Sequence, residues 1–225
     1  MLNLFKSYRN FANPWYRYVA NTPSLCKANS ERFSSLLLKN PEIARYVRNL
    51  NYRFHLPLSD HELNILDMLK KRSSLQSIRL SSSGLLMEWN YFPESIRSSL
   101  VSLIQLPTVT HLNTFAIIGF PVTAFSGCSI LIDLRLGDLN LAPPEVNHVI
   151  SHSKISTPVS LYMWKITHGF AALLSSASLH AGGRIIDFSR FQKVVFNVKS
   201  QGGIDQVNEL IKVTSRLEDF NLHRE

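Results

Sequence analysis

Two histidines spaced four residues apart are the first candidates for chemistry in this sequence. His148 and His152, in "HVISH", would share one face of a helix, as the zinc ligands of a metalloprotease do. That site also needs a glutamate directly after the first histidine, where this chain has Val149, and a third ligand is not evident. The pattern favours two surface histidines in a loop, so we predict no metal site.

Other residues that commonly carry catalysis lack the spacing that catalysis needs. Ser126, in "FSGCS", is not in a GxSxG nucleophile elbow, and no Asp/His pair stands out as its partner. The glycine pairs within 180–184 and 201–203 lack the spacing of phosphate-binding loops, and they indicate turns. We therefore predict a protein with no catalytic residues and no cofactor.

The two cysteines, Cys26 and Cys128, also lack a site pattern. They form no CxxC spacing, which favours two reduced thiols in an intracellular protein. No run approaches the roughly eighteen apolar residues of a membrane helix. Lys6, Arg9 and Arg17 interrupt the start of the chain, where a signal peptide needs an apolar core. The sequence predicts a soluble protein of the cytoplasm or nucleus with no membrane partner.

Composition and charge bound the remaining function classes. The chain has 225 residues, of which 45% are hydrophobic, as in a folded protein. Its formal net charge is +8, and residues 1–58 hold nine basic and two acidic side chains, so nearly all of the excess is N-terminal. With Trp15, Tyr16 and Tyr18 nearby, this region could contact nucleic acid or an acidic protein, or be only a solvated surface. Because the charges are scattered and no nucleic-acid motif accompanies them, nucleic-acid binding is the weaker alternative.

A short apolar pattern recurs along the chain. Its clearest copy is "LIDLRL", in which Leu131, Leu134 and Leu136 follow the spacing L-x-x-L-x-L. Further copies begin at residues 47, 75, 109, 159, 191 and 217, and the fifth of the seven copies in chain order is "VSLYMW". The intervals are 28, 34, 22, 28, 32 and 26 residues, near the roughly 20–29 residues of leucine-rich repeats but more scattered.

Helical patterns fill several of these intervals. Ser59 and Glu62 have the spacing of a capping box ahead of an apolar stripe, and Pro93 stands at the start of a second stripe. A strand with one apolar face and a helix with one apolar stripe need neighbouring units in order to bury both. The sequence therefore predicts an α/β fold, a leucine-rich-repeat-like solenoid of strand–helix repeats of about 22–34 residues over 47–225. A short helical N-terminal cap region, with two helices broken at Asn40–Pro41, is expected over 1–46.

Two longer stretches resemble a known family. "SERFSSLLLKNPEIARYVRNLNY" and "LPTVTHLNTFAIIGFPVTAFSGCSILIDLRLGDLNL" resemble the C-terminal halves of fungal F-box proteins with irregular leucine-rich repeats, over roughly residues 30–141. The matching positions of the second stretch are Leu106, Pro107, Leu112, Phe120, Pro121, Cys128, Leu131, Leu134 and Leu136. The resemblance implies a substrate receptor of a cullin-RING ubiquitin ligase, in which the F-box docks the ligase adaptor and the repeats hold the target. It also implies a packing role for Cys128. An F-box pattern is not recognisable before residue 30, so the resemblance covers the repeat half alone.

The candidate site is the concave strand surface of the predicted solenoid. Consensus positions pack inward, and the strand positions between them face solvent. We predict a protein-binding face made of Gln76, Arg79, His111, Asn113, Asp133, Arg135, Met163 and Lys193. Arginine is common at binding hot spots, although a solvated surface has the same pattern. The predicted function is a nonenzymatic protein-binding repeat scaffold, the substrate-recognition part of an F-box-type receptor. The alternative is a free-standing or truncated repeat protein that binds partners without a ligase.

Overall fold

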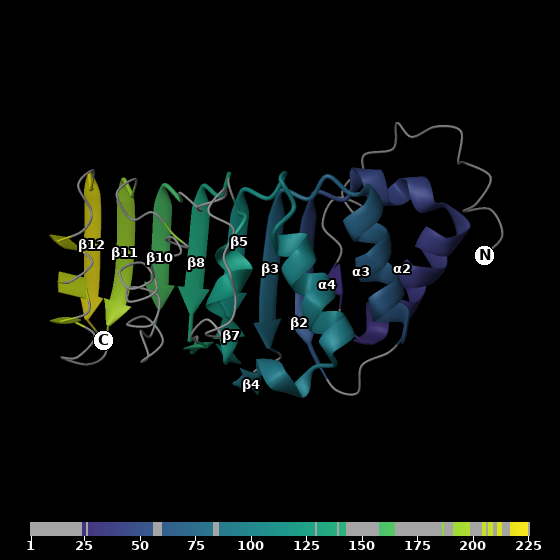
Figure 1. Ribbon diagram of the computed structural model, residues 1–225, viewed down its shortest axis with the longest axis horizontal. Helices are drawn as coiled ribbons and strands as arrows, with labels where there is room; N and C mark the ends of the chain where they lie inside the picture. The colour runs from purple at the N-terminus through teal and green to yellow at the C-terminus, as the bar shows by residue number, and fades with distance from the viewer. Residues whose placement is uncertain are drawn as a thin grey trace.

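Parallel strands in chain order form the frame of this protein. The computed structural model describes residues 24–25, 27–55, 60–82, 86–128, 130–138, 140–142, 158–164, 186, 191–198, 204–205, 207–208, 211–212 and 217–224. Within them, eight strands form one parallel sheet in which each strand pairs with the next along the chain (Figure 1). The strands are β1 (Ser24–Leu25), β2 (Asn49–Phe54), β3 (Ser77–Ser82), β5 (His111–Phe115), β8 (Asp133–Gly137), β10 (Ser160–Trp164), β11 (Lys193–Val198) and β12 (Asp219–Arg224). The predicted α/β class is confirmed.

Within the part of the chain that the structure describes, three α-helices with continuous bounds cover one face of this sheet at its N-terminal end. They are α2 (Lys27–Lys39), α3 (Asp60–Arg72) and α4 (Glu94–Ile104), which lie side by side in front of the N-terminal strands in Figure 1. The helix expected after Pro93 is confirmed, and it buries Ile96, Leu100 and Leu103. The expected break is also present, because α2 ends at Lys39 and a 3₁₀ helix, η1 (Pro41–Tyr46), follows. A residue before proline is disfavoured in helical conformation.

A continuous row of buried aromatic side chains joins β2 to the connecting segments of the chain. Beyond the main strands the chain forms β4 (Met87–Glu88), η2 (Trp89–Tyr91), β6 (Ile117–Ile118), β7 (Phe120–Pro121), η3 (Val122–Phe125) and β9 (Leu141–Ala142). The Phe54 ring lies 6.0 Å from Trp89, which lies 5.0 Å from Phe120, which in turn lies 5.7 Å from Phe125. These edge and tilted contacts join segments from four different parts of the chain into one core.

The strand register places the second and third consensus positions of the sequence pattern in two rows, in which Thr114 takes one position. One row is Leu50, Ile78, Leu112, Leu134, Leu161, Val194 and Phe220. The other is Tyr52, Leu80, Thr114, Leu136, Met163, Phe196 and Leu222. From β2 to β11 both rows are buried beneath the helical side of the sheet. Side chains alternate between the two faces of a strand, so the positions between these rows project from the opposite face.

The predicted position of the fifth copy of the pattern was wrong by one residue. We expected Val159, Tyr162 and Trp164 to point inward, but Leu161 and Met163 occupy the buried rows, and Pro158 is buried ahead of them. The copy therefore begins at residue 158. Four consecutive apolar residues, 161–164, give both faces of the strand equal apolar content, and the choice depends on pairing with β8 and β11. Tyr162 and Trp164 consequently lie on the outer face.

The sheet also extends into the N-terminal segment that we expected to be helical. β1 pairs in parallel with β2, matching Ser24 with Asn51 and Leu25 with Tyr52. Residues 1–46 therefore contribute a strand as well as α2 and η1, although residues 1–23 lie outside the described part. A boundary at residue 46 does not separate a helical unit from the sheet.

Candidate binding face

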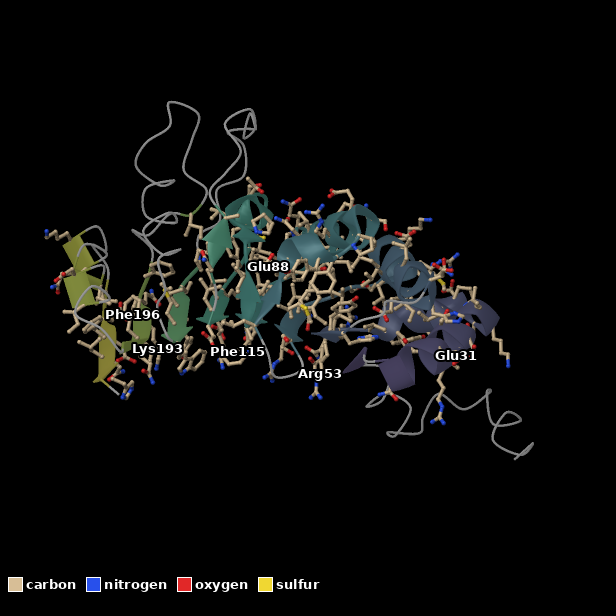
Figure 2. All side chains as sticks on the ribbon, turned by 90° about the horizontal axis from the view of Figure 1, so that it is seen from below. Glu31, Arg53, Glu88, Phe115, Lys193 and Phe196 are labelled. Atoms are coloured by element: carbon tan, nitrogen blue, oxygen red, sulfur yellow. The ribbon has the colours of Figure 1, made fainter. Side chains whose placement is uncertain are left out.

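One face of the sheet is left uncovered by the three α-helices, and we call it the open face. Its positions are Asn49, Asn51, Arg53, Ser77, Arg79, Ser81, His111, Asn113, Phe115, Asp133, Arg135, Gly137, Ser160, Tyr162, Trp164, Lys193, Val195, Asn197, Asp219, Asn221 and His223. Figure 2 shows Arg53, Phe115 and Lys193 projecting from this side, opposite the helices. The open face spans strands β2 to β12 and combines side chains far apart in sequence.

Most of the residues predicted for the binding face lie on it. They are Arg79, His111, Asn113, Asp133, Arg135 and Lys193. Gln76 is exposed but directly precedes β3, where its backbone carbonyl accepts bonds from the N–H groups of Thr110 and His111. Met163 was a wrong prediction: it is 6% exposed and shares an inward row with Leu136 and Phe196, because the register of β10 is shifted by one residue.

A group of four side chains forms the most distinctive part of the open face, and we call it the aromatic–arginine patch. Its members are Phe115, Arg135, Tyr162 and Trp164. The guanidinium carbon of Arg135 lies 4.6 Å from the centre of the Tyr162 ring, within the range of a cation–π contact. The Tyr162 and Trp164 rings stack with centroids 6.2 Å apart and planes inclined by 18°. Sequence reasoning missed Tyr162 and Trp164, since the register error assigned both to the core.

Arg135 is held in place before any partner arrives. Its Nε donates to Oδ2 of Asp133 over 2.9 Å, and a second guanidinium nitrogen lies 2.8 Å from the same oxygen. The hydrogen bond to Asp133 raises the pKa of Arg135 above its ordinary value, so the group is fully charged. The carboxylate on one side and the Tyr162 ring on the other restrict the guanidinium, which lowers the entropy that a binding partner must remove.

Phe115, the fourth member of the patch, packs over a glycine of the neighbouring strand. Gly137 pairs with Phe115 on one side and with Trp164 on the other. A Cβ atom at position 137 would overlap Cδ2 of the Phe115 ring, so the ring lies directly over the glycine backbone. Phe115 remains 39% exposed and Trp164 38% exposed, and the pair presents apolar area on both sides of Gly137.

The two halves of the open face differ in charge. Lys193 lies 2.8 Å from Asp219, and this hydrogen-bonded contact, with a smaller contribution from Tyr162, raises the pKa of the lysine. The C-terminal half thus pairs its cations with carboxylates. The strands β2, β3 and β5 carry Arg53, Arg79 and His111 on the open face and no Asp or Glu. Arg53 and Arg79 are exposed, and neither makes an ion pair with any other described residue.

A buried polar cluster lies on the other side of the sheet. The Tyr52 hydroxyl donates to Oε2 of Glu62 over 2.7 Å, and Nε2 of His55 lies 3.0 Å from Oε1. The sequence assigned Glu62 to a capping box, but its carboxylate is fully buried against β2. Burial, with the adjacent Glu62 charge, raises the pKa of Tyr52, which stays protonated and donates. The cluster ties α3 to β2 and does not reach the open face.

Cys128 is buried at a packing position. Its thiol lies 3.5 Å from the carbonyl oxygens of Ile104 and Ala124, and burial raises the pKa of the thiol from 9.0 to about 12. A thiol in this state is a poor nucleophile because the thiolate is the reactive form. Cys26 lies outside the described residues.

The buried thiol gives a test with two readouts. In a Cys26→Ser protein, we expect Cys128 to react with Ellman's reagent at pH 8 about 100-fold more slowly in the native state than in denaturant. The Cys128 thiol ionises at a lower pH in the unfolded chain than in the folded protein. The free energy of unfolding should therefore fall by about 1.4 kcal/mol per pH unit as pH rises from 9 towards 12. Adding Cys128→Ala should remove this pH dependence of the free energy of unfolding, measured by urea titrations. Equal reactivity in both states would contradict the buried position.

The remaining candidates from the sequence are not tested by the structure. His148, His152 and both glycine pairs lie outside the described residues. Among the residues that are described, no group of three or more His, Cys, Asp or Glu side chains could hold a metal ion. The same part of the chain contains no helix long and apolar enough to cross a membrane.

Comparison with protein-family models, with curated proteins and with solved structures found no match to this chain.

Proposed function

We propose that this chain is a leucine-rich-repeat-like scaffold whose open face binds another protein. The observation that carries the proposal is the aromatic–arginine patch, in which an arginine and three partly exposed aromatic rings adjoin on a face that the α-helices leave uncovered. Tyrosine, tryptophan and arginine dominate the energetics of protein interfaces, and a restrained arginine loses little further freedom on binding.

The repeat interpretation rests on register and burial together. Six copies of the L-x-x-L-x-L pattern, and the fifth after its shift to residue 158, align their apolar positions across seven consecutive parallel strands. The starts of β3, β5, β8, β10, β11 and β12 repeat one connection, in which a carbonyl accepts two N–H groups at the start of the next strand, as Gln76 does from Thr110 and His111. Stacked strand-containing units with one outer face are typical of repeat proteins that bind partners over an extended surface.

Removing two rings of the patch should remove partner binding. We expect Tyr162→Ala/Trp164→Ala to weaken binding by about 3 kcal/mol, roughly 100-fold, because both rings lie beside the restrained Arg135. The measurement is affinity capture from cell extract with quantitative mass spectrometry, comparing wild type and variant at equal bait concentration.

The matched control removes an exposed aromatic ring from the helical side. Tyr46, on η1, is 48% exposed, so Tyr46→Ala deletes similar surface away from the open face. Proteins retained by wild type and by Tyr46→Ala but lost by the double variant would support the open face. Identical capture by all three baits would exclude the patch as the binding surface.

The ligase role is the more specific form of this proposal. It is supported by the resemblance of residues 30–141 to fungal F-box proteins, in which the repeats hold the target of ubiquitination. Mapping the 5′ end of the transcript tests it directly. An in-frame upstream F-box, together with co-purification of the cullin-RING ligase adaptor, is the expected result. A transcript that begins at Met1 and a protein that does not bind the adaptor would leave a scaffold without ligase attachment.

A further inference from the structure

The open face presents cations at a defined spacing. One row of positions runs across the strands as Asn51, Arg79, Asn113, Arg135 and Tyr162, so that asparagine and arginine alternate up to the patch. Neighbouring strands lie about 4.8 Å apart, which puts the Arg79 and Arg135 positions roughly 10 Å apart. Arg53 lies diagonally beside Arg79 and adds a second exposed positive charge at that end.

This spacing matches one extended peptide conformation. A polyproline II segment has three residues per turn and a rise of about 3.1 Å, so side chains at i and i+3 point the same way about 9.3 Å apart. A β-extended peptide places same-face side chains about 6.8 or 13.5 Å apart, which fits the two arginines less well. Aromatic rings also favour polyproline II ligands, because such segments present apolar ridges.

We propose that the partner bound at the open face is an acidic extended segment of a protein. Carboxylates at i and i+3 face Arg79 and Arg135, and an adjoining apolar or prolyl residue covers Tyr162 and Trp164. The inference rests on the proposed function and names the chemistry of its partner. Nε of Arg135 donates to Asp133, which engages part of the guanidinium group. Planar guanidinium groups hold carboxylates through paired N–H donors.

The carboxylates of the same face argue against a nucleic-acid ligand. Asp219 lies beside Lys193, so a phosphate chain that continued past the aromatic–arginine patch to β11 and β12 would meet negative charge there. A peptide that carries its acids at one end and apolar residues at the other avoids that repulsion. The acidic end of such a segment would lie over the arginines of the open face, and its apolar end would lie over Tyr162 and Trp164.

Peptide selection against the full chain tests the proposal. A random twelve-residue display library is selected on wild type, and the enriched peptides are synthesised with fluorescein for anisotropy titrations. We expect Asp or Glu pairs three residues apart, followed by apolar residues. Arg79→Gln and Arg135→Gln should each weaken binding about five- to tenfold. Arg45→Gln, which removes an exposed arginine from η1, should change it less than about twofold.

The possible outcomes separate the two proposals. Peptides that lose binding with Tyr162→Ala/Trp164→Ala but carry no acidic pair, or ignore Arg79→Gln, overturn the acidic segment and leave the binding face intact. Peptides insensitive to every open-face variant overturn both, and a library with no enriched peptide overturns the acidic segment. A twelve-nucleotide oligouridine that binds with the same arginine dependence, when no peptide does, would overturn it in favour of nucleic acid. Circular dichroism of each variant confirms folding.

Discussion

Replacing Phe120 with alanine is expected to lower the free energy of unfolding by about 3–5 kcal/mol. Phe120 is fully buried, and its ring contacts both Trp89 at 5.0 Å and Phe125 at 5.7 Å. Removing the ring opens a cavity between two connecting segments at once. Trp89 then loses an edge contact and Phe125 loses a tilted contact. Urea denaturation of wild type and variant, followed by intrinsic fluorescence, measures the difference.

Phe115 supplies the matched control for this prediction. It has the same side chain only five residues away, but it lies on the open face and is 39% exposed. Phe115→Ala should cost less than about 1 kcal/mol, because the ring packs over Gly137 on one side only. A comparable loss of stability in both variants would show that the two faces of the sheet are assigned incorrectly.

Removal of the buried carboxylate of Glu62 should lower the free energy of unfolding by about 3 kcal/mol. Glu62→Ala leaves the Tyr52 hydroxyl without its acceptor in the core and leaves the His55 ring beside an empty space. Glu62→Gln keeps an oxygen that accepts from Tyr52, so it should lose clearly less stability than Glu62→Ala. Thermal and urea unfolding of both variants measure these differences.

Glu42 is the control for charge removal without burial. Its carboxylate is half exposed and lies 3.0 Å from Arg45 and 2.7 Å from Arg72, so it makes more ion pairs than Glu62. Exposed ion pairs contribute little, and Glu42→Ala should cost less than about 1 kcal/mol. If Glu42→Ala proved as harmful as Glu62→Ala, the account of a buried cluster joining α3 to β2 would be wrong.

Much of the frame follows from local patterns in the sequence. The period-two alternation in "LQSIRL" and "LIDLRL" placed Ile78, Leu80, Leu134 and Leu136 in the core correctly, because one face of each strand is apolar and the other polar. The stripe of α4 and the break before Pro41 were also predictable, because helix periodicity and proline geometry act within a few residues. The same alternation placed six of the eight predicted binding-face residues on the open face.

The parts that the sequence did not determine depend on contacts between distant segments. "SLYMW" is apolar on both faces, so only hydrogen bonding to β8 and β11 decides that Tyr162 and Trp164 face outward. Glu62 matches a capping pattern, but α3 packs it against Tyr52 of β2, which no local rule predicts.

The aromatic–arginine patch shows the same division most clearly. Phe115, Arg135, Tyr162 and Trp164 come from three strands separated by connections of different length, and no fixed spacing connects them in sequence. The sequence determines their amino-acid types and the tendency of their strands to pair. Their meeting on one face depends on the register of a parallel sheet, which is a property of neighbouring strands rather than of any one of them.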